Sequence, residues 1–298
     1  MKQIAELTKR NCRIYIRDKG AVFSSLLTMM IVIALMLVFL GDMNINSIAD
    51  GFFGENAADS IRENVKSYVF WWTVAGVLSV NSLMVVLTVL APMIADTENG
   101  IIQSFYTSPT ARWKITAGYI AAAWICSSVF SAAAMLGGIV IGAVKGYSIP
   151  LGNAFLAVLY SCVNAFMYSG LMYLIAVFAK STSAYSGIGT TVGTLCGFLG
   201  AIYIPAGTLP ESVLSVLKCL PVLHGTALIR QALTADAQNV LFDGMPAAYP
   251  EKLDDIMGVR LSFGENILSS QTELAILLIC GIIFLVAGAV ILKRKTDR

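Results

Sequence analysis

Long uncharged runs dominate the chain and alternate with short charged segments. Residues 67–95 and 115–144 contain no charged residue over 29 and 30 positions, and about 20 apolar residues are enough for a helix to cross the hydrocarbon core of a bilayer. The same pattern predicts six membrane-spanning helices, over residues 21–40, 68–95, 115–144, 154–179, 185–204 and 274–292. We therefore expect an all-α polytopic membrane protein whose residues 1–298 form a single transmembrane domain.

The N-terminal segment, residues 1–20, is basic and partly amphipathic. It carries six Lys or Arg interspersed with apolar residues, directly before the first predicted span. This pattern is typical of a helix that lies along the anionic surface of a membrane, so membrane lipid is an expected partner. A disordered basic flank is the alternative interpretation.

Lys and Arg are unevenly distributed between the two sides of the predicted topology. With both termini in the cytoplasm, the short cytoplasmic pieces hold 13 of the 20 Lys and Arg, and the longer outer pieces hold the other seven. Cytoplasmic loops carry an excess of Lys and Arg in membrane proteins. The sequence thus predicts a multi-pass protein of the cytoplasmic (plasma) membrane with both termini inside the cell.

The polar segment between the second and third spans, residues 96–109, predicts a short cytoplasmic helix. Asp96 or Thr97 can cap its N-terminus, and Glu98 places negative charge in its first turn. Ser108 followed by Pro109 indicates the start of the next helix. The apolar positions between these ends recur at helical spacing: Ile101, Ile102, Phe105 and Tyr106. Such a stripe favours a helix that docks on a cytoplasmic partner, although an ordinary surface loop is the alternative.

The region from residue 205 to residue 272 is neither a clean span nor an ordinary loop. Its two apolar pieces, residues 213–217 and 219–229, are interrupted by Lys218, Pro221 and His224, and each is too short to cross a bilayer. We interpret them as a re-entrant hairpin that dips into the outer leaflet before the last span. An acidic extracytoplasmic segment, residues 235–270, follows.

Composition excludes several classes of protein. Hydrophobic residues make up 57% of the 298 residues and charged residues 13%, and the mean hydropathy is +0.77, which no soluble domain of this size has. The net charge of +2 is not gathered on a basic domain, so no nucleic-acid partner is expected. The six cysteines and the single histidine form no cluster that predicts a metal site.

Motifs for catalysis and ion coupling are absent from the sequence. No GxxxxGK[ST] occurs, so the chain is not expected to bind ATP itself. Two Ser-Gly pairs and His224 are the only candidates for an intramembrane protease, and we expect them to be packing residues rather than catalytic ones. The predicted spans also lack the charged residues that ion-coupled carriers use.

The combination of these segments resembles the membrane subunit of a type 2 ABC exporter, the ABC-2 transporter permease family. The resemblance is carried by the basic N-terminal helix, by ENG and a later S-P in the loop at 96–109, and by LPESVLSVLKCLPVLHGTALIRQAL after the fifth span. In that family the loop forms a coupling helix with a glutamate-glycine pair and a downstream proline. The segment after the fifth span typically contains Leu-Pro, Asn-Pro and an Arg, matched here by Pro210, Pro221 and Arg230. Leu220 replaces the Asn, and His224 stands where a hydroxyl or aromatic residue is common.

Residue roles and partners follow from this resemblance. It implies a separate cytoplasmic ATPase that binds ATP and Mg²⁺, and a second permease copy, identical or related. The implied coupling residues are Glu98, Gly100, Ile101, Phe105 and Pro109. Because the second and fifth spans usually line the path in this family, the implied path residues are Asn81, Met84, Thr190, Thr194 and Phe198.

The substrate is less clear from the sequence. A path with few fixed charges suits an amphipathic drug, peptide or lipid moved outward across the membrane. Export of a polysaccharide or lipid-linked glycan is an alternative within the same class. A channel or a secondary carrier is the alternative from a different class. A gene for an ATPase beside this one would favour the exporter over a channel or carrier.

Overall fold

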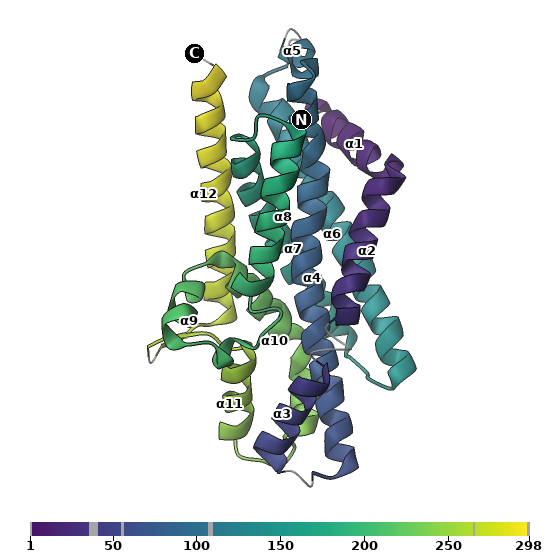
Figure 1. Cartoon of the computed structure of the whole chain (residues 1–298), viewed down its shortest axis with the longest axis vertical. Coiled ribbons are helices and arrows are strands. Elements are labelled where there is room, and N and C mark those ends of the chain that lie inside the picture. Colours follow the sequence, from purple (N-terminus) through teal and green to yellow (C-terminus); the bar gives the residue numbers. More distant parts are fainter. Residues whose placement is uncertain (1, 36–40, 55–56, 107–109, 265, 297–298) are drawn as a thin grey trace.

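The computed structural model describes residues 2–35, 41–54, 57–106, 110–264 and 266–296. These residues are almost entirely helical (Figure 1). The elements in chain order are α1 (Lys2–Arg17), α2 (Lys19–Leu35), α3 (Gly41–Phe53), α4 (Asp59–Glu98), α5 (Ile101–Tyr106), α6 (Arg112–Lys145), α7 (Leu151–Ala176), α8 (Thr182–Leu199), the 3₁₀ turn η2 (Ala206–Thr208), α9 (Glu211–Lys218), α10 (Pro221–Leu241), α11 (Ala248–Met257), β1 (Ser262–Phe263), β2 (Asn266–Ile267) and α12 (Ser270–Thr296). The prediction of an all-α polytopic protein is confirmed.

Helix α4 is the centre of the bundle. Its residues from Tyr68 to Leu83 are all buried, and α6, α7, α8 and α10 all pack against it. α12 packs mainly on α7, and its other side is an exposed apolar surface typical of a helix that faces lipid. Both ends of the described chain lie toward the end of the bundle that carries α5, whereas α3 and α11 lie at the opposite end (Figure 1).

Helix α4 is also longer than the predicted second span. It contains 40 residues and begins at Asp59, nine positions before the expected start at residue 68. Charged residues such as Glu63 and Lys66 did not end the helix, because they lie on an exposed surface where a helix tolerates charge readily. Together with α3, this extension gives helical structure to much of the segment 41–66, which the sequence indicated only as polar.

The number of spans differs from the prediction. In the part of the chain that the structure describes, α4, α6, α7 and α12 are long and apolar enough to cross a membrane, and the pair α9–α10 would make a fifth if it is one broken span. The expected span 21–40 corresponds to the 17 residues of α2 followed by residues 36–40, which lie outside the described residues. The expected span 185–204 corresponds to α8, in which ten of 18 residues are Ser, Thr or Gly. Six spans are therefore not confirmed.

The predicted hairpin is a pair of helices with one sharp bend. α9 and α10 meet at 89°, with the break at Cys219 and Leu220, between Lys218 and Pro221, and His224 does not interrupt α10. Pro221 starts α10, which is a favourable place for proline because the first turn of a helix needs no backbone N–H donor. α10 then continues to Leu241, 12 residues past the end of the apolar piece, since α4, α7 and α12 bury its polar residues.

The segment after α10 is folded and packs against the far end of α4 and α10. α11 and the antiparallel pair β1–β2 follow α10. Phe242, just after α10, contacts Phe52 and Phe53 of α3, with ring centroids 5.7 and 5.6 Å apart. We call this group of α3, α11, β1, β2 and the adjacent ends of α4 and α10 the α3–α11 extension. It has an apolar core continuous with that of the bundle.

The stability of the α3–α11 extension is expected to depend on pH through Asp254. Burial raises the pKa of this α11 carboxyl to about 6, although the hydrogen bond from Gln238 opposes the shift. An unfolded Asp has a pKa of about 3.9, so the folded protein binds more protons between about pH 4 and about pH 6. Stability should therefore fall as pH rises through this window and be constant above it. Thermal unfolding of the purified protein should show this slope, and Asp254→Asn should remove it.

The control for this experiment is Asp243→Asn, which changes an exposed carboxyl close by in the chain. It should leave the slope between about pH 4 and about pH 6 unchanged. A slope of the same size in Asp254→Asn would contradict the assignment.

Candidate functional site

The tip of the bundle is formed by the end of α4 and the short helix α5. Gly100 has φ = 73°, a left-handed conformation that suits glycine, and it separates the two helices. Ile101, the first residue of α5, is 43% exposed, and α5 lies at the very end of the molecule (Figure 1). The predicted short helix is thus present, although it spans residues 101–106 rather than 96–109. The side chain of Phe105 and all of Pro109 lie outside the described residues.

Asp96 and Glu98 belong to the last turn of α4, so the prediction that they begin the coupling helix is wrong. Nothing interrupts α4 before Gly100, and Thr97 and Asn99 bond back to carbonyl groups of α4 rather than capping a new helix. To cap the start of a following helix, their side chains would have to accept hydrogen bonds from backbone N–H groups two or three residues later in the chain.

Glu98 connects α4 to the start of α8. One carboxylate oxygen, Oε2, accepts hydrogen bonds from the backbone N–H and the side-chain hydroxyl of Thr182, both at 2.8 Å. Thr182 is the first residue of α8, and a carboxylate is favourable there because the N-terminus of a helix carries partial positive charge. Glu98 therefore does complement a helix dipole, but that of α8 rather than that of α5.

Asp96 connects α4 to α1 through a largely buried ion pair. Its Oδ2 lies 2.9 Å from a guanidinium nitrogen of Arg10 and accepts a hydrogen bond from the hydroxyl of Tyr119 on α6. Burial by itself would lower the pKa of Arg10, but the hydrogen bonds and charge of Asp96 and Tyr119 outweigh it, so the pKa of Arg10 is raised. Three helices thus meet at one carboxylate.

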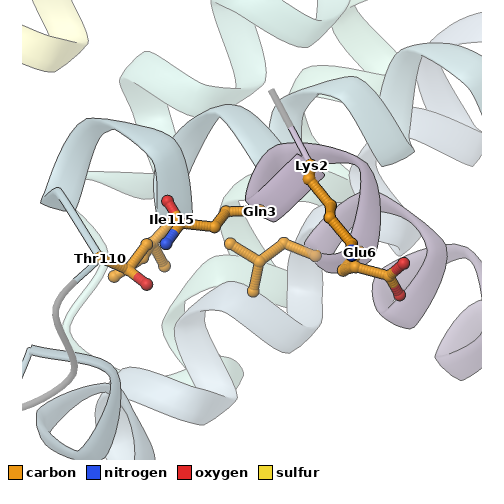
Figure 2. A pocket seen from close by; sticks show the side chains of 6 residues that line it. Lys2, Gln3, Glu6, Thr110 and Ile115 are labelled. Atoms are coloured by element: carbon orange, nitrogen blue, oxygen red, sulfur yellow. The ribbon is translucent and has the colours of Figure 1, made fainter.

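Helix α1 packs closely on α6. A Cβ at Gly118 would lie 2.5 Å from Cβ of Leu7, so this approach requires glycine. Lys114 donates a hydrogen bond of 3.0 Å to Gln3. Near this contact is a cavity of ≈ 380 Å³ lined by Lys2, Gln3, Glu6, Leu7, Thr110 and Ile115. Figure 2 shows Gln3 extending toward Thr110 and Ile115, with Lys2 and Glu6 on the other side. The predicted N-terminal helix is present, and it is fixed to the bundle.

The predicted path residues lie in two different environments. Asn81 is buried in α4 and Met84 is half-buried, with a methionine carbon 2.2 Å from where a Cβ of Gly193 on α8 would be. The glycine face of α8 therefore packs on α4. Thr190, Thr194 and Phe198 each follow a glycine of that face by one residue, so they lie about 100° around α8 from it, and all three are exposed. Within a single copy of the chain, Met84 contacts α8, but the five predicted path residues do not line one common surface. Their role in a path stays a prediction.

The three residues singled out in the predicted hairpin lie at the starts of helices or in the core. Pro210 precedes α9 and Pro221 begins α10. Arg230 is completely buried in α10 and donates to the carbonyl oxygens of Ala201 at 2.6 Å and Met257 at 3.2 Å. Its guanidinium also lies 4.2 Å from the ring centroid of Trp72, an attractive cation–π distance. Arg230 thus joins α10 to α4 and to the α3–α11 extension.

Sequence reasoning missed the partners of Asp96 and Glu98. The one available signal for Asp96 was its position as the first charge after 29 uncharged residues, since a charge at the edge of a span often has a partner. Nothing in the sequence identified Arg10, 86 positions away, as that partner. Among the described residues no group of three or more His, Cys, Asp or Glu could hold a metal ion.

Comparison with known proteins gives one family match. Residues 2–234 match the family described as ABC-2 type transporter, a region that includes α1 to α9 and most of α10. None of the curated proteins matches the chain.

Proposed function

Since the chain belongs to the ABC-2 type transporter family, it is the membrane-spanning permease of an ABC transporter, and we propose that it exports an amphipathic substrate with energy from a separate ATPase. The substrate class is a drug, a peptide or a lipid, moved outward across the cytoplasmic membrane. In this proposal α5 and both chain termini are cytoplasmic, and the ATPase subunit binds ATP and Mg²⁺. The permease itself carries out no chemical step.

The observation that carries this proposal is the arrangement of acidic residues at the tip. Glu98 is bonded to α8 and Asp96 to α1 and α6, and both lie within five positions of Ile101, which begins α5. A movement of α5 is therefore transmitted to α4, α8 and α1 through short polar contacts. ATP can drive transport through this tip only if the ATPase pair holds α5 differently in its two states, because a ligand shifts an equilibrium by its differential affinity alone.

A second permease copy completes the proposed path. Phe198 is 52% exposed and lies with Thr190 and Thr194 on an exposed face of α8, beside the glycine face that packs on α4. Exposed threonines on a membrane helix are favourable against another protein or a substrate rather than against lipid. We infer that this face of α8 meets a second copy, identical or related, and that the substrate passes between the two.

The proposal is tested by substitution of Phe105, an aromatic residue of the predicted apolar stripe, which in this proposal enters a groove on the ATPase. Phe105→Asp places a charge in that groove and should weaken binding of the ATPase at least about 30-fold, the effect of losing an interface hot spot. The measurement is recovery of the ATPase subunit and of ATPase activity when the permease is purified from mild detergent.

Gln103→Asp is the matched control, because it introduces the same charge at an exposed position of the same helix. It should keep the ATPase bound. Wild-type permease that purifies reproducibly without any ATPase would remove the energy source from the proposal, and unchanged ATPase binding in Phe105→Asp would contradict the docking role of α5.

A further inference from the structure

His224 and Glu273 are buried side chains that face one another across two helices. His224 lies in the first turn of α10 and is 1% exposed, and Glu273 lies in the first turn of α12 and is 0% exposed. Nδ1 of His224 is 4.0 Å from Oε1 of Glu273. Neither atom has a hydrogen-bond partner among the described residues. Two facing polar atoms without partners are costly in a buried site.

The other atoms of these two side chains are already engaged, and their partners fix where hydrogen atoms lie. Nε2 of His224 is 2.8 Å from the carbonyl oxygen of Lys218. A carbonyl oxygen only accepts, so Nε2 carries a hydrogen and Nδ1 of a neutral imidazole has a lone pair.

Gln231 determines the role of the second carboxylate oxygen. Its Nε2 donates to Oε2 of Glu273 and to the carbonyl oxygen of Val259, both at 2.9 Å. Its Oε1 accepts from the hydroxyl of Ser270 at 2.7 Å, which confirms the orientation of the amide. Oε2 of Glu273 is therefore an acceptor, and any hydrogen on the carboxyl group belongs on Oε1, the atom that faces His224.

The charged residues near the pair form their hydrogen bonds elsewhere. Of the described titratable groups, His224 is the one whose charge acts on the Glu273 carboxyl group. Arg230 of α10 donates to the carbonyl oxygens of Ala201 and Met257, Asp254 of α11 accepts from Gln238, and Lys218 of α9 meets His224 through its backbone carbonyl. With neutral His224 and ionised Glu273, two lone pairs would face each other in a buried site, and one proton removes the conflict.

We propose that His224 and Glu273 bind one proton between them, and that this proton holds α10 against α12. Whether it resides on Nδ1 or on Oε1, it forms the missing hydrogen bond and leaves the pair with no net charge. Loss of the proton in alkaline solution leaves a buried carboxylate beside a lone pair and loosens the first turns of both helices. The site is independent of the ATPase and of the identity of the substrate.

Glu273→Gln tests the proposal, because a glutamine has the same shape and carries a permanent hydrogen. Its amide NH₂ can donate to Nδ1 while its oxygen accepts from Gln231, so the hydrogen no longer depends on pH. The thermal unfolding midpoint of the wild-type protein should fall when the pH is raised from neutral into the alkaline range, because the folded pair then loses its proton. In Glu273→Gln this fall should be smaller by at least about 3 °C.

The controls separate this pair from the general effect of alkaline pH. Glu211→Gln changes an exposed glutamate of α9, and its thermal unfolding midpoint should fall at alkaline pH as that of the wild type does. His224→Gln removes the imidazole and should also reduce the fall, which provides a second test if Glu273→Gln does not fold. A wild-type fall that persists in a folded Glu273→Gln or His224→Gln protein would overturn the proposal.

Discussion

Arg230→Leu is expected to destabilise the protein by about 3 kcal/mol or more. The substitution removes the donors to the carbonyl oxygens of Ala201 and Met257 and the contact with Trp72, all of them buried. Arg230→Lys should restore little of this stability, because a lysine has one compact donor group in place of the planar fork that reaches several carbonyl oxygens. The measurement is the thermal unfolding midpoint of the purified variants in detergent.

A near-neutral Arg230→Leu would contradict this prediction in an informative way. Buried charges can be replaced by apolar residues of similar volume without loss of stability when the remaining polar groups find other partners. A change of less than about 1 kcal/mol would therefore mean that the carbonyl oxygens of Ala201 and Met257 are satisfied in other ways. Gln238→Ala in α10 offers a comparison, since it removes a partly buried side chain that bonds within the same extension.

Reversal of the charge at Asp96 is expected to detach α1 from the bundle. Asp96→Arg places a second cation against Arg10 and removes the acceptor of the Tyr119 hydroxyl. Because Arg10 is about one-third exposed, water screens part of the effect, and we expect a cost of about 1–3 kcal/mol in the docking of α1. The population of undocked α1 should rise roughly 5- to 150-fold.

Limited digestion with trypsin measures this population, since α1 contains Lys9, Arg10, Arg13 and Arg17. Cleavage within α1 should be faster in Asp96→Arg, and Arg10→Asp combined with Asp96→Arg should recover part of the protection. Asp96→Asn keeps an acceptor for Tyr119 and should have an intermediate rate. Equal cleavage rates in the wild type and in Asp96→Arg would show that the ion pair does not hold α1.

The spans that the sequence predicted well are those with uninterrupted apolar runs. Residues 115–144 and 274–292 became α6 and α12 with small changes at their ends, because hydropathy alone decides which residues lie in lipid. α4 and α10 were predicted too short. Both continue into the α3–α11 extension, where burial by neighbouring helices rather than lipid stabilises them, and a single sequence contains no direct signal for that packing.

The candidate site could be predicted only as far as local chemistry reaches. A short helix was predicted across residues 96–109, but Gly100 separates α4 from α5, because glycine adopts positive φ without strain. The partners of Glu98, Asp96 and His224 could not be predicted, since each lies on a helix far away in the sequence. In particular, Glu273 directly precedes the predicted span 274–292, and the sequence does not indicate that it is completely buried and bonded to Gln231 of α10.

Helix α4 is one continuous element of 40 residues, about 60 Å long, and about twice as long as the hydrocarbon core is thick. A tilt of about 5° around its midpoint moves each end by roughly 2.6 Å, so the two ends cannot move independently. An antibody fragment that clamps the α3–α11 extension would therefore restrain the tip at α5 from the opposite end of the bundle. For inhibitor discovery, a ligand of the extension could therefore act on the movement proposed for the tip.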